Sequence, residues 1–219
     1  MSSKTRKLVF TALFAALTTA FTMISVPLAT GYFNFGDLVI FVASVFLGPL
    51  YGAIVGAIGG ALGDVILGYI AYMPFTLVIK AIEGVIVGIL YKIVAKFCKG
   101  KSSGGILEVV FTLLVNLLAG SFMALGYFLA EGLILSDAHW TGGIVQLPFN
   151  FLQGVVSACV AVVLLYPCQL KRIFGRYFNK NSIPREKQDA HSNEVTTESG
   201  KTADTQEQPD ETNDEDKGL

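Results

Sequence analysis

Residues with catalytic or metal-binding chemistry are scarce in this chain of 219 residues. It contains two histidines, three cysteines and one tryptophan, and neither an HExxH nor a GxSxG sequence. The odd number and spacing of Cys98, Cys159 and Cys168 match no metal-ligand motif, so we expect buried or reduced thiols. An intramembrane enzyme would need a nucleophile or metal set that this sequence lacks. We therefore expect no enzymatic activity, no cofactor and no metal site.

Charge is also sparse and unevenly placed. Charged residues make up 15% of the chain and hydrophobic residues 53%, and the apolar residues form long runs separated by short polar breaks, as in membrane proteins. Residues 1–179 hold eleven Lys or Arg against six Asp or Glu, whereas residues 180–219 hold five against eleven. We predict a membrane domain over residues 1–180 and an acidic cytoplasmic tail over residues 181–219, too poor in apolar residues to fold.

The apolar runs predict six transmembrane helices, at residues 8–29, 38–47, 50–70, 74–97, 106–133 and 142–166. Helices are expected because unpaired backbone groups find no water in hydrocarbon, and no run alternates as barrel strands do. The first run resembles a secretory signal, but it is too long and further spans follow it. The second is short for a ~30 Å hydrocarbon core, so it must recruit neighbouring aromatic residues or thin the bilayer.

Basic residues give the expected orientation. The loops at 31–36, 69–73 and 136–143 contain no Lys or Arg. Three basic clusters mark cytoplasmic edges under the positive-inside rule: Lys4, Arg6 and Lys7; Lys92, Lys96, Lys99 and Lys101; Lys171, Arg172, Arg176 and Lys180. Residues 95–102 loosely match a phosphate-binding loop, but they follow a transmembrane run and have bulky residues where glycines are needed. The fold class is therefore an all-α, multi-pass membrane protein with six transmembrane helices and both termini cytoplasmic.

Small residues recur at helical spacing in two of the expected spans. Ala12, Ala16 and Ala20 form a four-residue ladder that would let another helix approach closely, although alanine ladders also arise by chance. In the third span the glycines are denser, at positions 52, 56, 59, 60 and 63. Close packing inside the bundle is the interpretation that we prefer for these glycines.

Lys80 and Glu83 stand three residues apart within the fourth span, on one helical face. Ionisable residues inside a membrane usually face a bundle interior or a wet cavity and mark function. Two interpretations remain open: a structural ion pair, or a pair that grips a polar molecule between helices.

Further polar residues are expected at similar depth. Asn150 and Gln153 share a face just after Pro148, and Glu131 lies near the outer end of the fifth span. With neighbouring aromatic residues they suit a small polar ring compound in a cavity that opens outward. Asp37 and Asp64, nearer helix ends, are interpreted as helix caps or loop anchors.

Several stretches together resemble a known family: FLGPLYGAIVGAIGGALGDVILGY, PFTLVIKAIEGVIVG, GYFLAEGL and LPFNFLQG, with basic residues before an alanine-ladder helix and an aromatic loop ending in Gly36-Asp37. Over about residues 5–170 they resemble the S component of an energy-coupling-factor (ECF) vitamin transporter. The resemblance implies a prokaryotic plasma-membrane protein that binds a vitamin or precursor from outside. It would work in the lipid bilayer with a transmembrane coupling subunit and two cytoplasmic ATPases; no nucleic-acid partner is expected.

The resemblance also implies roles for particular residues. The small-residue motif of the first helix, which contacts the coupling subunit in the family, corresponds to Ala12, Ala16 and Ala20. The family's ligand pocket is formed by the first loop and helices four to six, which implies Asn34, Lys80, Glu83, Tyr127, Glu131, Asn150 and Gln153.

The family's substrates include riboflavin, thiamin precursors such as hydroxymethylpyrimidine, pyridoxine-type compounds, folate and pantothenate. Side chains alone do not choose among them; we expect the riboflavin, hydroxymethylpyrimidine or pyridoxine type. A stand-alone secondary transporter of a small polar solute is the alternative. Such a protein would usually show an internal repeat of broken helices and a coupling-ion site, and no repeat is evident.

Overall fold

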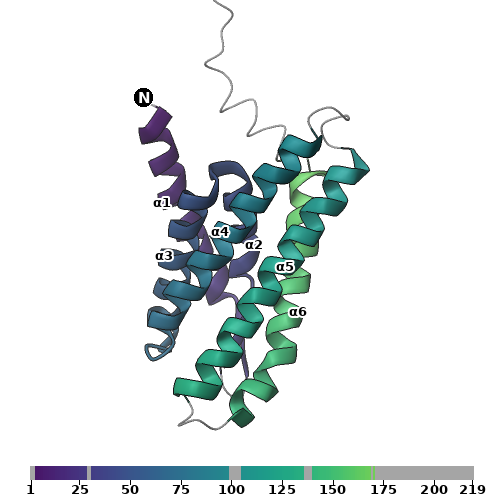
Figure 1. Ribbon diagram of the computed structural model, residues 1–219. Helices are drawn as coiled ribbons and strands as arrows, with labels where there is room; N and C mark the ends of the chain where they lie inside the picture. Colours follow the sequence, from purple (N-terminus) through teal and green to yellow (C-terminus); the bar gives the residue numbers. More distant parts are fainter. Residues whose placement is uncertain (1–2, 29–30, 99–104, 136–139, 169, 171–219) are drawn as a thin grey trace, which may run out of the picture. The chain divides into compact units, whose positions relative to one another are not determined.

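The computed structural model describes residues 3–28, 31–98, 105–135, 140–168 and 170 (Figure 1). This part of the chain is mostly helical, with one short hairpin. Its elements are α1 (Ser3–Met23), β1 (Ser25–Leu28), β2 (Gly31–Asn34), α2 (Gly36–Leu47), α3 (Pro49–Leu67), α4 (Met73–Cys98), α5 (Ile106–Ala130), the π-helix η1 (Glu131–Leu135) and α6 (Trp140–Leu165).

The helices pack as a bundle in which successive helices reverse direction. α3 lies between α1 and α4, α5 lies between α4 and α6, and α2 contacts α1, α3, α4 and α6. Gly48, with φ of 87°, turns α2 into α3, and Pro49 begins α3, where a missing N–H costs nothing. The β1–β2 hairpin, the end of α3 and the start of α4 consequently lie at one end of the bundle, which we call the hairpin end.

The glycines of α3 allow close approach of its neighbours, as the sequence predicted. A Cβ built on Gly59 would lie 2.6 Å from Thr18 Cβ of α1, and one on Gly56 would meet the backbone carbonyl of Lys80 in α4. Gly63 faces α1 in the same way, against Thr22. These helices therefore contact almost backbone to backbone, as small residues permit in membrane bundles.

Four helices in the described part of the chain are long and apolar enough to cross a membrane: Lys4–Met23, Pro49–Leu67, Ile106–Leu133 and Trp140–Leu165. α2 is apolar but has only 12 residues. α4 has 26 residues, and its sequence includes Lys80, Glu83, Lys92 and Lys96. Large apolar side chains face outward, such as Leu114 and Leu118 of α5, whereas many polar side chains are buried. This distribution suits a lipid surrounding.

The first expected span is wrong at its end. α1 stops at Met23, and Ser25–Leu28 forms a strand that pairs antiparallel with Gly31–Asn34. The apolar residues Val26 and Leu28 extended the hydrophobic run in the sequence. Pro27, however, lacks the N–H that a helix needs, whereas proline does occur in short edge strands. The fold is thus not purely helical. The remaining expected helices differ at their ends by a few residues, and the predicted tail lies outside the described residues.

Candidate ligand-binding site

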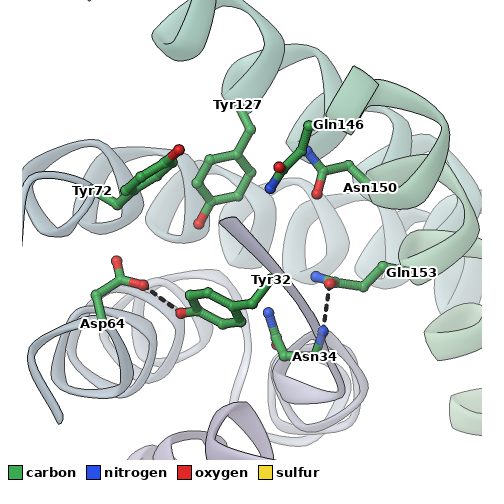
Figure 2. A pocket seen from close by; sticks show the side chains of 8 residues that line it. All are labelled: Tyr32, Asn34, Asp64, Tyr72, Tyr127, Gln146, Asn150 and Gln153. Atoms are coloured by element: carbon green, nitrogen blue, oxygen red, sulfur yellow. Dashed lines mark hydrogen bonds between the residues drawn. The ribbon is translucent and has the colours of Figure 1, made fainter. Parts of the chain in front are cut away.

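A cavity lies at the hairpin end, between the hairpin, α3, α5, α6 and the turn before α4 (Figure 2). Its cavity volume is about 20 Å³, and the empty space of about 310 Å³ around the lining atoms includes open solvent. The lining residues are Tyr32, Asn34, Asp64, Tyr72, Tyr127, Gln146, Asn150 and Gln153.

All but one of the side chains that line the cavity are uncharged. Four of its side chains are amides, three are phenols and one, Asp64, is a carboxylic acid; no Lys or Arg is among them. Amides supply both hydrogen-bond donors and acceptors, and tyrosine rings supply apolar faces with a polar tip. Such a lining suits a neutral, polar ring compound.

The hairpin forms one wall of the cavity and is held by side chains. The Tyr32 hydroxyl donates a hydrogen bond to Asp64 of α3, and the Tyr32 ring packs on Tyr69 with centroids 4.8 Å apart. Burial, together with the neighbouring Asp64 carboxylate, raises the pKa of the Tyr32 hydroxyl far above its usual value. Tyr32 is therefore protonated and acts as the donor. Asp64 anchors the loop, as expected, and also lines the cavity.

α6 supplies the opposite wall from a single face. Gln146, Asn150, Gln153 and Ser157 follow one another at spacings of four, three and four residues, and all four side chains are buried. The Asn150 Nδ2 atom is buried and has no hydrogen-bond partner in the described residues. An unpartnered buried amide costs free energy unless a ligand or water completes it. On the α5 side, the Tyr127 hydroxyl lies 2.9 Å from Thr76 Oγ1.

A charged network connects α2, α4 and α6 next to this wall. Lys80 Nζ of α4 contacts Asp37 Oδ1 of α2 and lies 3.2 Å from Glu83 Oε2. Gln153 Nε2 donates to Asp37 Oδ2 at 2.8 Å. Asp37 and Glu83 are fully buried, and Lys80 is 4% exposed. Two carboxylates thus share one ammonium group in the bundle interior.

The expected site residues fall into two groups. Asn34, Tyr127, Asn150 and Gln153 line the cavity together. Lys80 and Glu83 are not part of its lining; they pair with each other and, for Lys80, with Asp37. Glu131 is also outside the lining, but it accepts a hydrogen bond from the Tyr72 hydroxyl.

The interpretation of Asp37 as a cap or loop anchor is wrong. Its carboxylate bonds Lys80 and Gln153, whereas at the start of α2 the Gly36 N–H donates to Asn34 Oδ1 at 2.8 Å. Sequence reasoning also missed Tyr72 and Gln146 as lining residues. Gln146 could have been found, because it precedes Asn150 by one helical turn. Tyr72 lies in a turn before α4 and carries no periodic signal.

Outside the cavity, Ala12, Ala16 and Ala20 are exposed along α1, whose opposite face is buried against the bundle. The ladder is therefore free to contact another helix. At the end of the bundle away from the hairpin, α5 buries a carboxylate that the sequence interpretation overlooked: Glu108 is 3% exposed and accepts a hydrogen bond from the Tyr91 hydroxyl at 3.3 Å.

Comparison with known proteins decides the family. The sequence matches the family described as "ECF-type riboflavin transporter, S component" over residues 2–171. The chain belongs to this family of ECF transporter S components. It is also 38% identical over 144 residues to an uncharacterized protein in the gap 3' region of Pyrococcus woesei, which covers 66% of this chain and 86% of that protein.

Membership in the S-component family fits the structural findings. The match includes every helix of the bundle, the hairpin and all residues that line the cavity. S components are transport proteins of the membrane rather than enzymes, and the apolar outward faces of the helices agree with that setting.

Proposed function

We propose that this S component captures a neutral heteroaromatic vitamin or precursor, of the riboflavin, hydroxymethylpyrimidine or pyridoxine type, for ATP-driven uptake into a prokaryotic cell. The observation that carries the proposal is the cavity at the hairpin end, lined by four amides and three tyrosines. Asn34, Tyr127, Asn150 and Gln153 are the proposed ligand contacts, joined by Tyr32, Tyr72 and Gln146.

The proposed topology has six membrane crossings with both termini in the cytoplasm. α4 counts as a span because the ammonium of Lys80 is paired inside the bundle, and Lys92 and Lys96 lie toward its other end. α2 has only 12 residues, so the β1–β2 hairpin that precedes it is proposed to cover the remaining thickness of the bilayer. Basic residues at 4–7, 92–101 and 171–180 are placed inside by the positive-inside rule, so the cavity opens to the outside.

The absence of a basic side chain from the described lining favours ligands without a negative charge. A carboxylate ligand such as folate or pantothenate would meet the Asp64 carboxyl group and find no cation. Moving an anion out of water without a partner is costly. Lys80 does not supply that partner, because it already faces two carboxylates. Lys80 and Glu83 are proposed to support the site without touching the ligand, through the network that includes Asp37. Glu131 is proposed to support it by holding the lining residue Tyr72.

Transport is proposed to depend on partners that this chain does not contain: a transmembrane coupling subunit and two cytoplasmic ATPases. The exposed ladder of Ala12, Ala16 and Ala20 is the proposed contact with the coupling subunit, since small residues let two helices approach closely.

The test is ligand identification. The purified full-length protein would be analysed by mass spectrometry for released small molecules, and then titrated with riboflavin, hydroxymethylpyrimidine, pyridoxine, folate and pantothenate. We expect tight binding of one of the first three compounds. Binding of folate or pantothenate alone would contradict the proposal, and so would uptake in vesicles that lack any ATPase.

A further inference from the structure

We infer that Asp37, which does not touch the cavity, fixes the orientation of the Gln153 amide, so that α6 presents a paired hydrogen-bond acceptor and donor to the edge of the ligand's ring. The acceptor is Gln153 Oε1 and the donor is Asn150 Nδ2. This inference rests on the proposed function, because it assigns the ligand chemistry of the same cavity.

The orientation of Gln153 follows from two independent constraints. Its Nε2 lies 2.8 Å from Asp37 Oδ2, and its Oε1 lies 2.8 Å from the backbone nitrogen of Asn34. A carboxylate can only accept hydrogen bonds and a backbone N–H can only donate. Turning the amide over would place donor against donor at Asn34 and acceptor against acceptor at Asp37. One orientation alone satisfies both partners.

Asp37 holds this role because Lys80 keeps its carboxylate in place. The Lys80 ammonium contacts Oδ1 of Asp37, which leaves Oδ2 for Gln153. Asp37 is fully buried and Gln153 is 2% exposed, so water does not compete for these bonds. Three elements, β2, α2 and α4, thus determine the direction of a single amide on α6.

Gln153 Oε1 has a second lone pair after it accepts from Asn34, and Gln153 lines the cavity (Figure 2). Asn150 lines it from the same face of α6, and its Nδ2 is buried without a partner in the described residues. Residues three apart on a helix have neighbouring side chains. A ring edge with a donor beside an acceptor, such as a lactam, an imide or an amino-substituted ring with a neighbouring ring nitrogen, satisfies both amides at once.

The experiment compares each ligand with a derivative in which methyl groups replace the hydrogen-bond donor. Riboflavin is paired with its derivative methylated at the imide nitrogen, hydroxymethylpyrimidine with its N-dimethylated amine, and pyridoxine with its phenol methyl ether. For the pair that the wild type binds, we expect methylation to weaken binding about tenfold, since a buried acceptor then loses its donor.

Two variants test the role of Asp37. In Asp37→Asn the new amide can donate as well as accept, so only the Asn34 N–H still orients Gln153. The ratio of affinities between the paired ligands should therefore fall toward one. The swap Asp37→Asn with Gln153→Glu keeps the total charge and gives residue 153 two oxygens, so an acceptor faces Asn34 and the ligand whichever way the side chain turns, and discrimination should return. Hydrogen exchange of the hairpin amides, measured without ligand, should rise in the single variant and fall again in the swap. Ser44→Ala is the matched control, because Ser44 is buried in α2 and its Oγ has no partner in the described residues.

The outcomes separate this inference from the proposed function. Binding with equal affinity for both members of a pair, or unchanged discrimination in Asp37→Asn, overturns the inference and leaves the proposed function standing. Failure of the wild type to bind any of the three parent compounds overturns both. Loss of discrimination in the single variant with recovery in the swap supports the inference, because general damage to the fold would not be repaired by a second substitution.

Discussion

Removal of the Lys80 ammonium should destabilise the protein strongly. Lys80→Met leaves the buried carboxylates of Asp37 and Glu83 without their shared cation. Removing one partner of a buried ion pair typically costs about 3–5 kcal/mol. For a chain of this size 1 kcal/mol corresponds to roughly 2–4 °C, so the melting temperature should fall by about 6–20 °C.

Rescue variants show which carboxylate matters. Lys80→Met with Glu83→Leu should not recover stability, because Asp37 remains a buried, unpaired charge. Lys80→Met with Glu83→Gln and Asp37→Asn removes all three charges and should recover most of it, as neutral replacement of buried ion pairs often does. Glu83→Gln alone should change stability by less than about 1 kcal/mol, since the Lys80–Asp37 pair survives.

The assay is thermal denaturation of the detergent-solubilised protein, followed by size-exclusion chromatography. Lys96→Met is the matched control, because Lys96 is exposed in the last turn of the same helix. A loss of less than about 3 °C in Lys80→Met, or full recovery in its combination with Glu83→Leu, would show that Asp37 is not the principal partner of Lys80.

Three further predictions concern the helix α1, its contact with α3 and the tail. Ala16→Leu should block uptake by the assembled transporter while ligand affinity of the isolated protein stays unchanged; equal loss of both would show that the ladder only packs this bundle. Gly59→Val should lower stability by about 1–3 kcal/mol through overpacking against Thr18, whereas Ile58→Val, on the exposed side of α3, should not. Deletion of residues 185–219 should leave binding and uptake largely intact, and a sharp fall in uptake would show that the tail contacts a partner.

Helix positions were predictable because apolar runs and small-residue spacings are local in sequence. The spacing of Gly59 and Gly63 predicted close packing, and in the structure α1 packs against both glycines. The hairpin was not predictable in this way. Val26 and Leu28 continue the apolar run of α1, and the pairing that makes them a strand depends on residues 31–34.

Only part of the charged network could be predicted from the sequence. Lys80 and Glu83 share a helical face, which any helical wheel shows, but Asp37 joins them from α2, 43 residues away from Lys80 in sequence. Which charged residues line a cavity and which lie behind it depends on how α2, α4 and α6 converge. Spacing within one helix does not contain that information.

The cavity between the hairpin, α5 and α6 is proposed to hold the vitamin. The test is the ligand affinity of Asn150→Leu beside that of Leu152→Ala, an exposed neighbour on the same helix. Loss of a buried hydrogen bond and an unsatisfied ligand group should weaken binding about tenfold or more in Asn150→Leu, with a melting temperature near that of the wild type. Leu152→Ala should bind as the wild type does. Wild-type affinity in a stable Asn150→Leu variant would show that the ligand binds elsewhere.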